Sequence, residues 1–192
     1  MKKVFIIHGF GGAPNGGWFP WLMGELAKNH TFACSLPMPN TNDPLASEWV
    51  TTMHSYIEPN EEVFIVGHSL GGPAVLRYLE SLPDKVMVGG VLLVSPVFEK
   101  LDVEDLSSDF RKIDNFFTTE FNFKKIKECI KKSIIVHGGK DPIVPLAHSE
   151  KISQGLDSEL VVVENGDHFS QKTEPICYQL PEAFDALMKM IK

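Results

Sequence analysis

The chain has 192 residues, with 18 Lys or Arg against 25 Asp or Glu, so its formal net charge is −7. A chain of this length corresponds to one domain with a sizeable core. The acidic excess argues against a nucleic-acid-binding protein, because neutralising phosphates requires clustered Lys and Arg.

Short apolar runs rich in β-branched residues predict β-strands. They are Val4–Ile7, Phe32–Cys34, Val63–Val66, Val91–Val94, Ile134–Val136 and Leu160–Val163. None alternates cleanly between apolar and polar residues, which is typical of parallel strands covered on both faces. Helical patterns lie between them, at about Trp18–Lys28, Ala46–Tyr56, Pro73–Ser81, Lys124–Lys131, Leu146–Gln154 and Pro181–Ile191. The alternation predicts a single domain over residues 1–192, a three-layer α/β sandwich with right-handed crossovers and no large cap domain.

The least regular segment is 95–122, which contains an acidic stretch followed by several phenylalanines. A loop this long inside a compact domain is usually functional or disordered, and its aromatic content argues against full disorder. We interpret it as a small variable cap or pocket wall. The alternative is a satellite cluster of the core.

Neither a membrane anchor nor a disulfide framework is indicated. The first apolar run, Val4–Ile7, is shorter than the ~7–15 residues of a secretory signal, and no stretch approaches the ~18 of a membrane span. The cysteines Cys34, Cys129 and Cys177 are odd in number and far apart. Reduced thiols suit the cytosol, so we expect a soluble, cytoplasmic protein that does not bind membranes.

The sequence Gly67-His68-Ser69-Leu70-Gly71 matches the pattern G-x-S-x-G. It follows a predicted strand and precedes a predicted helix, which is the setting of a nucleophile elbow, where a sharp turn holds the serine at the edge of a sheet. We therefore expect Ser69 to be a catalytic nucleophile rather than part of a structural turn.

A serine hydroxyl needs a base, and His168 is the best placed of the histidines. It follows the last predicted strand, so it should lie at the same carboxyl edge of a parallel sheet as Ser69. Asp141 follows the strand before that and is the candidate to orient His168, with Glu99 and Asp102 as rivals. The order Ser69, Asp141, His168 is that of α/β hydrolases.

The oxyanion of an acyl-transfer reaction needs two N–H donors. The backbone N–H of Leu70 is one candidate, and that of Phe10 in the loop after the first strand is the other, with Gly11 as the second choice. The glycines of this loop match neither nucleotide-binding pattern, and no metal-ligand spacing is evident, so we expect no cofactor and no metal.

The motifs described so far, together with Phe117-Thr118, Lys140-Asp141-Pro142-Ile143-Val144-Pro145 and Gly166-Asp167-His168-Phe169, resemble those of one family. It comprises small serine hydrolases of the type of YdeN and the mammalian retinoblastoma-binding serine hydrolase. The resemblance covers essentially the whole chain. It implies a mostly parallel sheet of about six strands in the order 2-1-3-4-5-6, with Ser69, His168 and Asp141 as nucleophile, base and orienting acid. The partner-binding motif L-x-C-x-E of the mammalian relative is missing here, so no retinoblastoma-type partner is expected.

The expected activity is hydrolysis of a small ester through an acyl-enzyme, with amides and thioesters as alternatives. Short apolar acyl groups are favoured, and Gly11, Phe117 and Val144 are candidate pocket residues. A protein-binding module with vestigial activity is the alternative function. Perhydrolase and lyase chemistry also stay open, whereas a dehalogenase would need Asp at position 69. Size and charge are compatible with a monomer.

Overall fold

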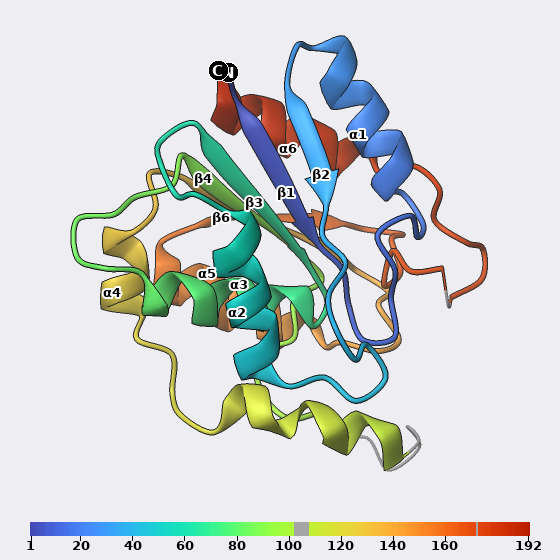
Figure 1. The fold of residues 1–192 in the computed structure, drawn as a ribbon. Helices are drawn as coiled ribbons and strands as arrows, with labels where there is room; N and C mark the ends of the chain where they lie inside the picture. Colours follow the sequence, from blue (N-terminus) through green and yellow to red (C-terminus); the bar gives the residue numbers. More distant parts are fainter. Residues whose placement is uncertain (102–107, 172) are drawn as a thin grey trace.

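The computed structural model describes residues 1–101, 108–171 and 173–192. Its sheet has six strands, all parallel, in the order β2-β1-β3-β4-β5-β6 (Figure 1). The strands are β1 (Lys3–Ile7), β2 (Phe32–Ser35), β3 (Val63–His68), β4 (Gly90–Val94), β5 (Ser133–Gly138) and β6 (Glu159–Val163). The helices are α1 (Phe19–Lys28), α2 (Ala46–Tyr56), α3 (Gly71–Ser81), α4 (Phe123–Glu128), α5 (Leu146–Leu156), α6 (Pro181–Ile191) and the 3-10 helix η1 (Ser108–Phe117).

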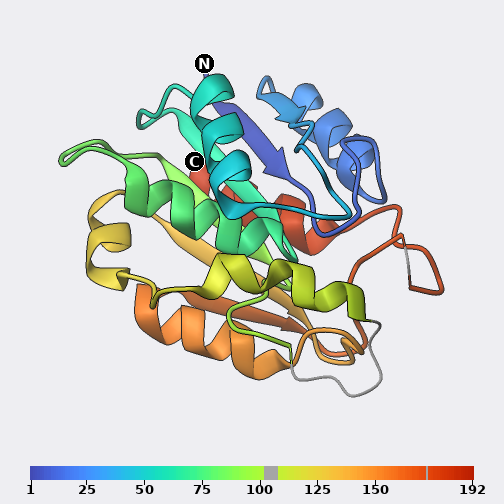
Figure 2. The same ribbon diagram turned by 60° about the horizontal axis from the view of Figure 1, so that its bottom comes forward.

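Helices cover both faces of the sheet (Figures 1 and 2). Successive strand residues point to opposite faces, so Ile65 of β3 packs in one core cluster and Val66 in the other. The first cluster receives buried side chains from α2, α3, α4 and α5, and the second from α1 and α6. This double burial explains why the strands read as continuous apolar runs.

The candidate site lies at the carboxyl ends of the parallel strands, near the point where the strand order reverses. β1 pairs with β2 on one side and with β3 on the other, so the order reverses between β1 and β3. Ile7 at the end of β1 is level with Gly67 of β3, and Gly138 at the end of β5 is level with Val163 of β6. Ligands of open α/β sheets bind at the carboxyl ends of the strands near such a switch point.

The described part of segment 95–122 contributes to the core. Ile113 and Phe116 of η1 are almost completely buried, and the Phe116 ring meets that of Trp49 edge-on, with centroids 5.6 Å apart. The predicted helices and strands agree with the structure to within a few residues, whereas η1 has no counterpart among them. Asp102 lies outside the described residues.

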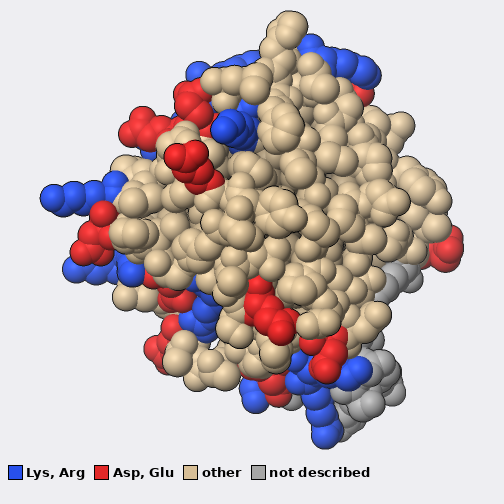
Figure 3. Space-filling model, viewed as in Figure 1, with Lys and Arg blue, Asp and Glu red and all other residues tan. Residues whose placement is uncertain are grey.

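The charged residues of one face are mixed in sign. Figure 3 shows Lys and Arg side chains interspersed with Asp and Glu around the rim, while uncharged residues occupy the centre. Over the ranges that the structure describes, no helix is long and apolar enough to cross a membrane.

Candidate active site

Ser69 occupies a strained turn between β3 and α3. Its φ of 54° lies in the left-handed region, which is uncommon for residues other than glycine and typical of functional turns. The turn is tight because the start of α3 packs against the end of β1. A Cβ on Gly71 would lie 2.2 Å from the carbonyl oxygen of Ile7, so no larger residue fits there. The Ser69 N–H donates to the carbonyl of Val94 at 3.0 Å, which fixes the turn to β4.

The structure brings Ser69, His168 and Asp141 together from three different strand ends. His168 Nε2 lies 2.9 Å from Ser69 Oγ, and His168 Nδ1 lies 2.7 Å from Asp141 Oδ2. The carboxylate accepts the Nδ1 proton, which leaves Nε2 free to accept the serine proton. The His168 and Asp141 side chains are 5% and 1% exposed, so these hydrogen bonds are shielded from water.

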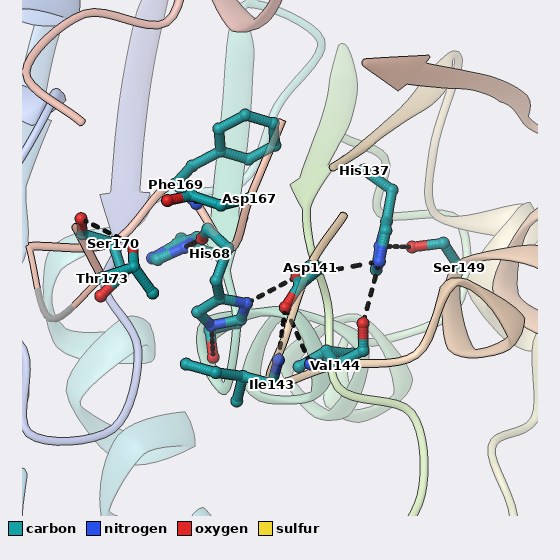
Figure 4. A network of polar contacts seen from close by, with 12 residues as sticks. His68, His137, Asp141, Ile143, Val144, Ser149, Asp167, Phe169, Ser170 and Thr173 are labelled. Atoms are coloured by element: carbon teal, nitrogen blue, oxygen red, sulfur yellow. Dashed lines mark hydrogen bonds and ion pairs between the residues drawn. The ribbon is translucent and has the colours of Figure 1, made fainter. Parts of the chain in front are cut away.

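Asp141 is held as a carboxylate by its own loop (Figure 4). Its Oδ1 accepts the backbone N–H groups of Ile143 and Val144, each at 2.9 Å. Burial pushes the pKa of Asp141 upward, but the hydrogen bonds from His168, Val144 and Ile143 outweigh it and bring the pKa below its usual value. Asp141 therefore stays charged and can stabilise an imidazolium on His168.

Two side chains from other elements hold the backbone of the His168 loop. Nε2 of His68, on β3, donates to the His168 carbonyl at 2.9 Å. The indole N–H of Trp18 donates to the Phe169 carbonyl at 3.0 Å, and Phe169 itself has a φ of 51°. Burial, together with the nearby His168, lowers the pKa of His68 to about 3, so His68 is a neutral donor near pH 7.

The rival acids are engaged elsewhere or not described. Glu99 is half exposed and forms an ion pair with Lys151 at 2.7 Å. Asp167, next to His168 in sequence, accepts the backbone N–H of Phe169 at 2.7 Å. Asp141 is therefore the acid that the described structure places on His168.

The predicted oxyanion donors flank Ser69. Leu70 follows the serine directly and is the N-cap residue of α3. The loop after β1 crosses close to the serine, because a Cβ on Gly9 would lie 2.9 Å from the Ser69 Cβ. Phe10, the next residue, lines the same cavity as Ser69 and His168. Both backbones are thus near Ser69, as an oxyanion site requires.

A cavity of about 70 Å³ opens beside Ser69. Its apolar walls come from three segments that are far apart in the sequence, one after each of β1, β5 and β6. They are Phe10, Ala13, Trp18, Phe19, Ile143 and Phe169. Gly9, Gly12, Gly16, Gly17, His8, His68, Ser170 and Gln171 complete the lining. None of the described residues of segment 95–122 belongs to it.

The structure corrects the predicted pocket residues. Val144 does not line the cavity; its backbone N–H donates to Asp141, and its side chain is fully buried in the first core cluster. Phe117 lines a separate surface hollow with Phe98, Phe121 and Phe123. Gly11 does not line the cavity, and its N–H is engaged by the carbonyl of Thr41 at 2.7 Å.

Sequence reasoning missed three residues whose side chains hydrogen-bond to the loops of the site. The sequence patterns gave no role to the side chains of His68 and His137, and they placed Trp18 only at the start of a predicted helix. Their position next to Ser69 and just before the Asp141 loop was the available signal. The hydrogen-bond partners of these side chains lie on other elements, so their positions in the sequence did not show what the side chains do.

A parallel sheet with a serine on a nucleophile elbow, and with His and Asp at later strand ends, defines a protein of the α/β-hydrolase class. The model of the serine hydrolase family matches residues 4–187. The chain belongs to this family of serine hydrolases.

Two curated relatives cover nearly the whole chain. The hydrolase YdeN of Bacillus subtilis (strain 168) is 34% identical over 187 residues, which is 97% of this chain and 94% of that protein. The serine hydrolase RBBP9 of Rattus norvegicus is 27% identical over 175 residues, or 90% of this chain and 89% of that protein.

Solved structures confirm the fold. The crystal structure of the ydeN gene product from B. subtilis superposes with a TM-score of 0.90 at 33% identity, covering 99% of this chain and 98% of the other. Est1E from Butyrivibrio proteoclasticus has a TM-score of 0.73 at 17% identity, covering 99% and 88%, which shows a common fold alone.

Proposed function

We propose that the protein hydrolyses small esters through an acyl-enzyme formed on Ser69. The observation that carries this proposal is the continuous hydrogen-bond chain from Ser69 Oγ through His168 to Asp141, with links of 2.9 and 2.7 Å. A hydroxyl is a weak nucleophile until a base within hydrogen-bonding distance accepts its proton. The base must in turn be oriented by a third group, as His168 is by Asp141.

The proposed reaction runs in two halves. Ser69 Oγ attacks the ester carbonyl while His168 Nε2 takes the serine proton, and the N–H groups of Leu70 and Phe10 bind the developing oxyanion. The carbon–oxygen bond to the alcohol then breaks, and the alcohol leaves with the proton from His168. Water, deprotonated by His168, attacks the acyl-enzyme in the same way, which releases the carboxylic acid and restores Ser69.

The cavity supports a small substrate with a short apolar acyl group. Its volume of about 70 Å³ is well below the ~300–1,000 Å³ typical of pockets for drug-sized ligands. Apolar rings dominate its walls, and burying each methylene against them contributes about 0.8 kcal/mol. Chains longer than the cavity lose that contribution and meet the ring of Phe19 or Trp18 instead.

Labelling with a fluorescent fluorophosphonate tests the function. We expect rapid covalent labelling of the wild type at Ser69, located by peptide mass spectrometry, because the reagent needs an activated serine and a formed oxyanion site. His168→Ala removes the base and should abolish the labelling. A well-folded wild type that is not labelled would contradict the proposal and favour a protein-binding role on a hydrolase scaffold.

Phe19→Ala should shift the acyl-length preference. Phe19 is 5% exposed and lines the cavity, with its ring centroid 6.0 Å from that of His68. Wild type should prefer acetyl and propionyl esters of p-nitrophenol. In Phe19→Ala, kcat/KM should rise about fourfold for each further methylene that the enlarged cavity takes up, from about 0.8 kcal/mol per methylene.

Leu22→Ala is the matched control for this change. Leu22 is fully buried on the same helix but does not line the cavity. Its truncation should cost about 2–5 kcal/mol of stability, as buried leucines usually do, without changing the ratio of longer to shorter esters. The same ratio in wild type and Phe19→Ala would show that the cavity does not hold the acyl group.

A further inference from the structure

A second imidazole lies on the other side of Asp141 from His168. His137, near the end of β5, is fully buried, and its Nε2 is 3.8 Å from Asp141 Oδ2. The same oxygen accepts the Nδ1 proton of His168 at 2.7 Å. Figure 4 shows His137 to one side of Asp141, with Ile143 and Val144 below the carboxylate. The carboxylate therefore has a buried neighbour that the proposed reaction does not use.

The hydrogen-bond partners of His137 determine its tautomer. The Val144 carbonyl lies 3.0 Å from Nε2 and can only accept, so Nε2 carries the proton. In a neutral ring Nδ1 is then an acceptor, and the Ser149 hydroxyl, 2.7 Å away on α5, must donate to it. Burial lowers the pKa of His137, which favours the neutral ring.

The peptide of Val144 links His137 to the carboxylate. Its N–H donates to Asp141 Oδ1 at 2.9 Å, while the carbonyl of the same residue accepts from His137. Asp141 Oδ2 lies 3.8 Å from the same nitrogen, so its negative charge also favours a proton on Nε2. In the opposite tautomer, the Nε2 lone pair would face two oxygens, that of Val144 and that of Asp141. These two oxygens therefore select the Nε2–H tautomer, and the Ser149 hydroxyl, which can donate or accept, fixes the ring through Nδ1.

We propose that Ser149 and His137 form a positioning pair for Asp141. Ser149 fixes the orientation of the His137 ring through Nδ1, and the Nε2–H of His137 holds the Asp141–Val144 loop so that the carboxylate meets His168. Neither residue lines the cavity beside Ser69, so they act through Asp141 and not on substrate. The catalytic consequence rests on the function proposed above, whereas the hydrogen-bond arrangement can be tested without turnover.

Ser149→Ala tests the proposal. Without the hydroxyl, the His137 ring loses its partner at Nδ1 and should hold the Asp141–Val144 loop less firmly, so the His168 Nδ1 proton should exchange faster with solvent. We expect kcat for p-nitrophenyl acetate to fall about 10- to 100-fold, the cost of a misplacement of up to roughly 1 Å, with KM nearly unchanged. Ser149→Thr keeps a hydroxyl and should recover most of the lost kcat.

Ser153→Ala is the control on the same helix. Its hydroxyl donates to the Ser158 carbonyl at 2.7 Å, so its loss also removes a hydrogen bond made by a side chain of α5, but not one to His137. It should leave kcat and both NMR signals as in wild type. An equal loss of kcat in Ser153→Ala would show general loosening of α5 and overturn the proposal.

NMR of the wild type separates this proposal from the proposed function. Long-range nitrogen–proton spectra of the imidazoles should show the His137 proton on Nε2. A proton on Nδ1, or a Ser149→Ala variant with an unchanged His168 Nδ1 proton, would overturn the positioning role whatever the activity. A wild type that is neither labelled nor active, but has the expected spectra, would contradict only the ester hydrolysis.

Discussion

Replacing Ser69 by alanine is expected to lower kcat for ester hydrolysis by about 10⁶-fold, as removal of a catalytic serine does in well-studied hydrolases. The large effect follows from the geometry, because Ser69 Oγ is the atom that His168 is placed to deprotonate, at 2.9 Å. Without it no acyl-enzyme forms, and a water in its place lacks the same fixed position. Steady-state hydrolysis of p-nitrophenyl acetate by purified protein measures the loss.

Ser69→Gly separates lost chemistry from lost folding. A left-handed conformation costs most residues about 1–2 kcal/mol but costs glycine almost nothing. With φ at 54°, the glycine variant should therefore unfold at a higher temperature than Ser69→Ala, while both are equally inactive. If either variant retained more than about one hundredth of the wild-type kcat, a serine mechanism would be contradicted, because the activity expected to remain is far smaller.

The free energy of unfolding is expected to fall by about 3 kcal/mol between pH 7.5 and 4.5 from His68 alone. Burial lowers the pKa of His68 from 6.5 to about 3, so in this interval the unfolded chain binds a proton that the folded protein does not. Stability is therefore complete above about pH 6.5 and is lost as the pH falls toward 3, at about 1.4 kcal/mol per pH unit.

The other perturbed groups act in the same direction. Burial also lowers the pKa of His8, His137 and His148, so each resists protonation in the folded protein. The pKa of Asp141 is lowered as well, and its contribution is lost when the carboxylate is protonated at still lower pH. The total fall in the free energy of unfolding on acidification should thus exceed the fall that His68 alone contributes.

Urea unfolding at pH 7.5 and 4.5 measures this dependence. His68→Gln removes the titrating ring, so the difference between the two pH values should shrink by about 3 kcal/mol, the share expected from linkage. His54→Gln, which removes an exposed ring on α2, is the control and should keep the wild-type difference. Equal unfolding free energies at the two pH values in wild type would refute the argument.

The hydrogen-bonded arrangement of Ser69, His168 and Asp141 is supported by residues outside these three. His68 and Trp18 hold the carbonyls of His168 and Phe169, and Gly71 lets α3 begin directly at the serine. A reacting group must be held to within a fraction of an ångström for efficient catalysis. The strained turn at Ser69 is tolerated because the surrounding contacts determine it.

The sequence by itself determined the fold and the identity of the three residues that meet at the site. Apolar runs are a local signal, and the strands that they predicted all occur in the sheet. Parallel strands end at one edge, so Ser69, Asp141 and His168, each placed after a predicted strand, had to lie near that edge. Their meeting could be predicted without knowing a single side-chain orientation.

Only the tertiary structure decided which residues wall the cavity and which hold the catalytic groups in place. Trp18 and Phe169 are 151 residues apart, and no local pattern links them. Val144 was expected at the pocket but is buried, because its peptide is turned toward Asp141. Side-chain direction beyond a strand end depends on loop dihedrals such as those of Ser69 and Phe169, and long-range packing sets these dihedrals.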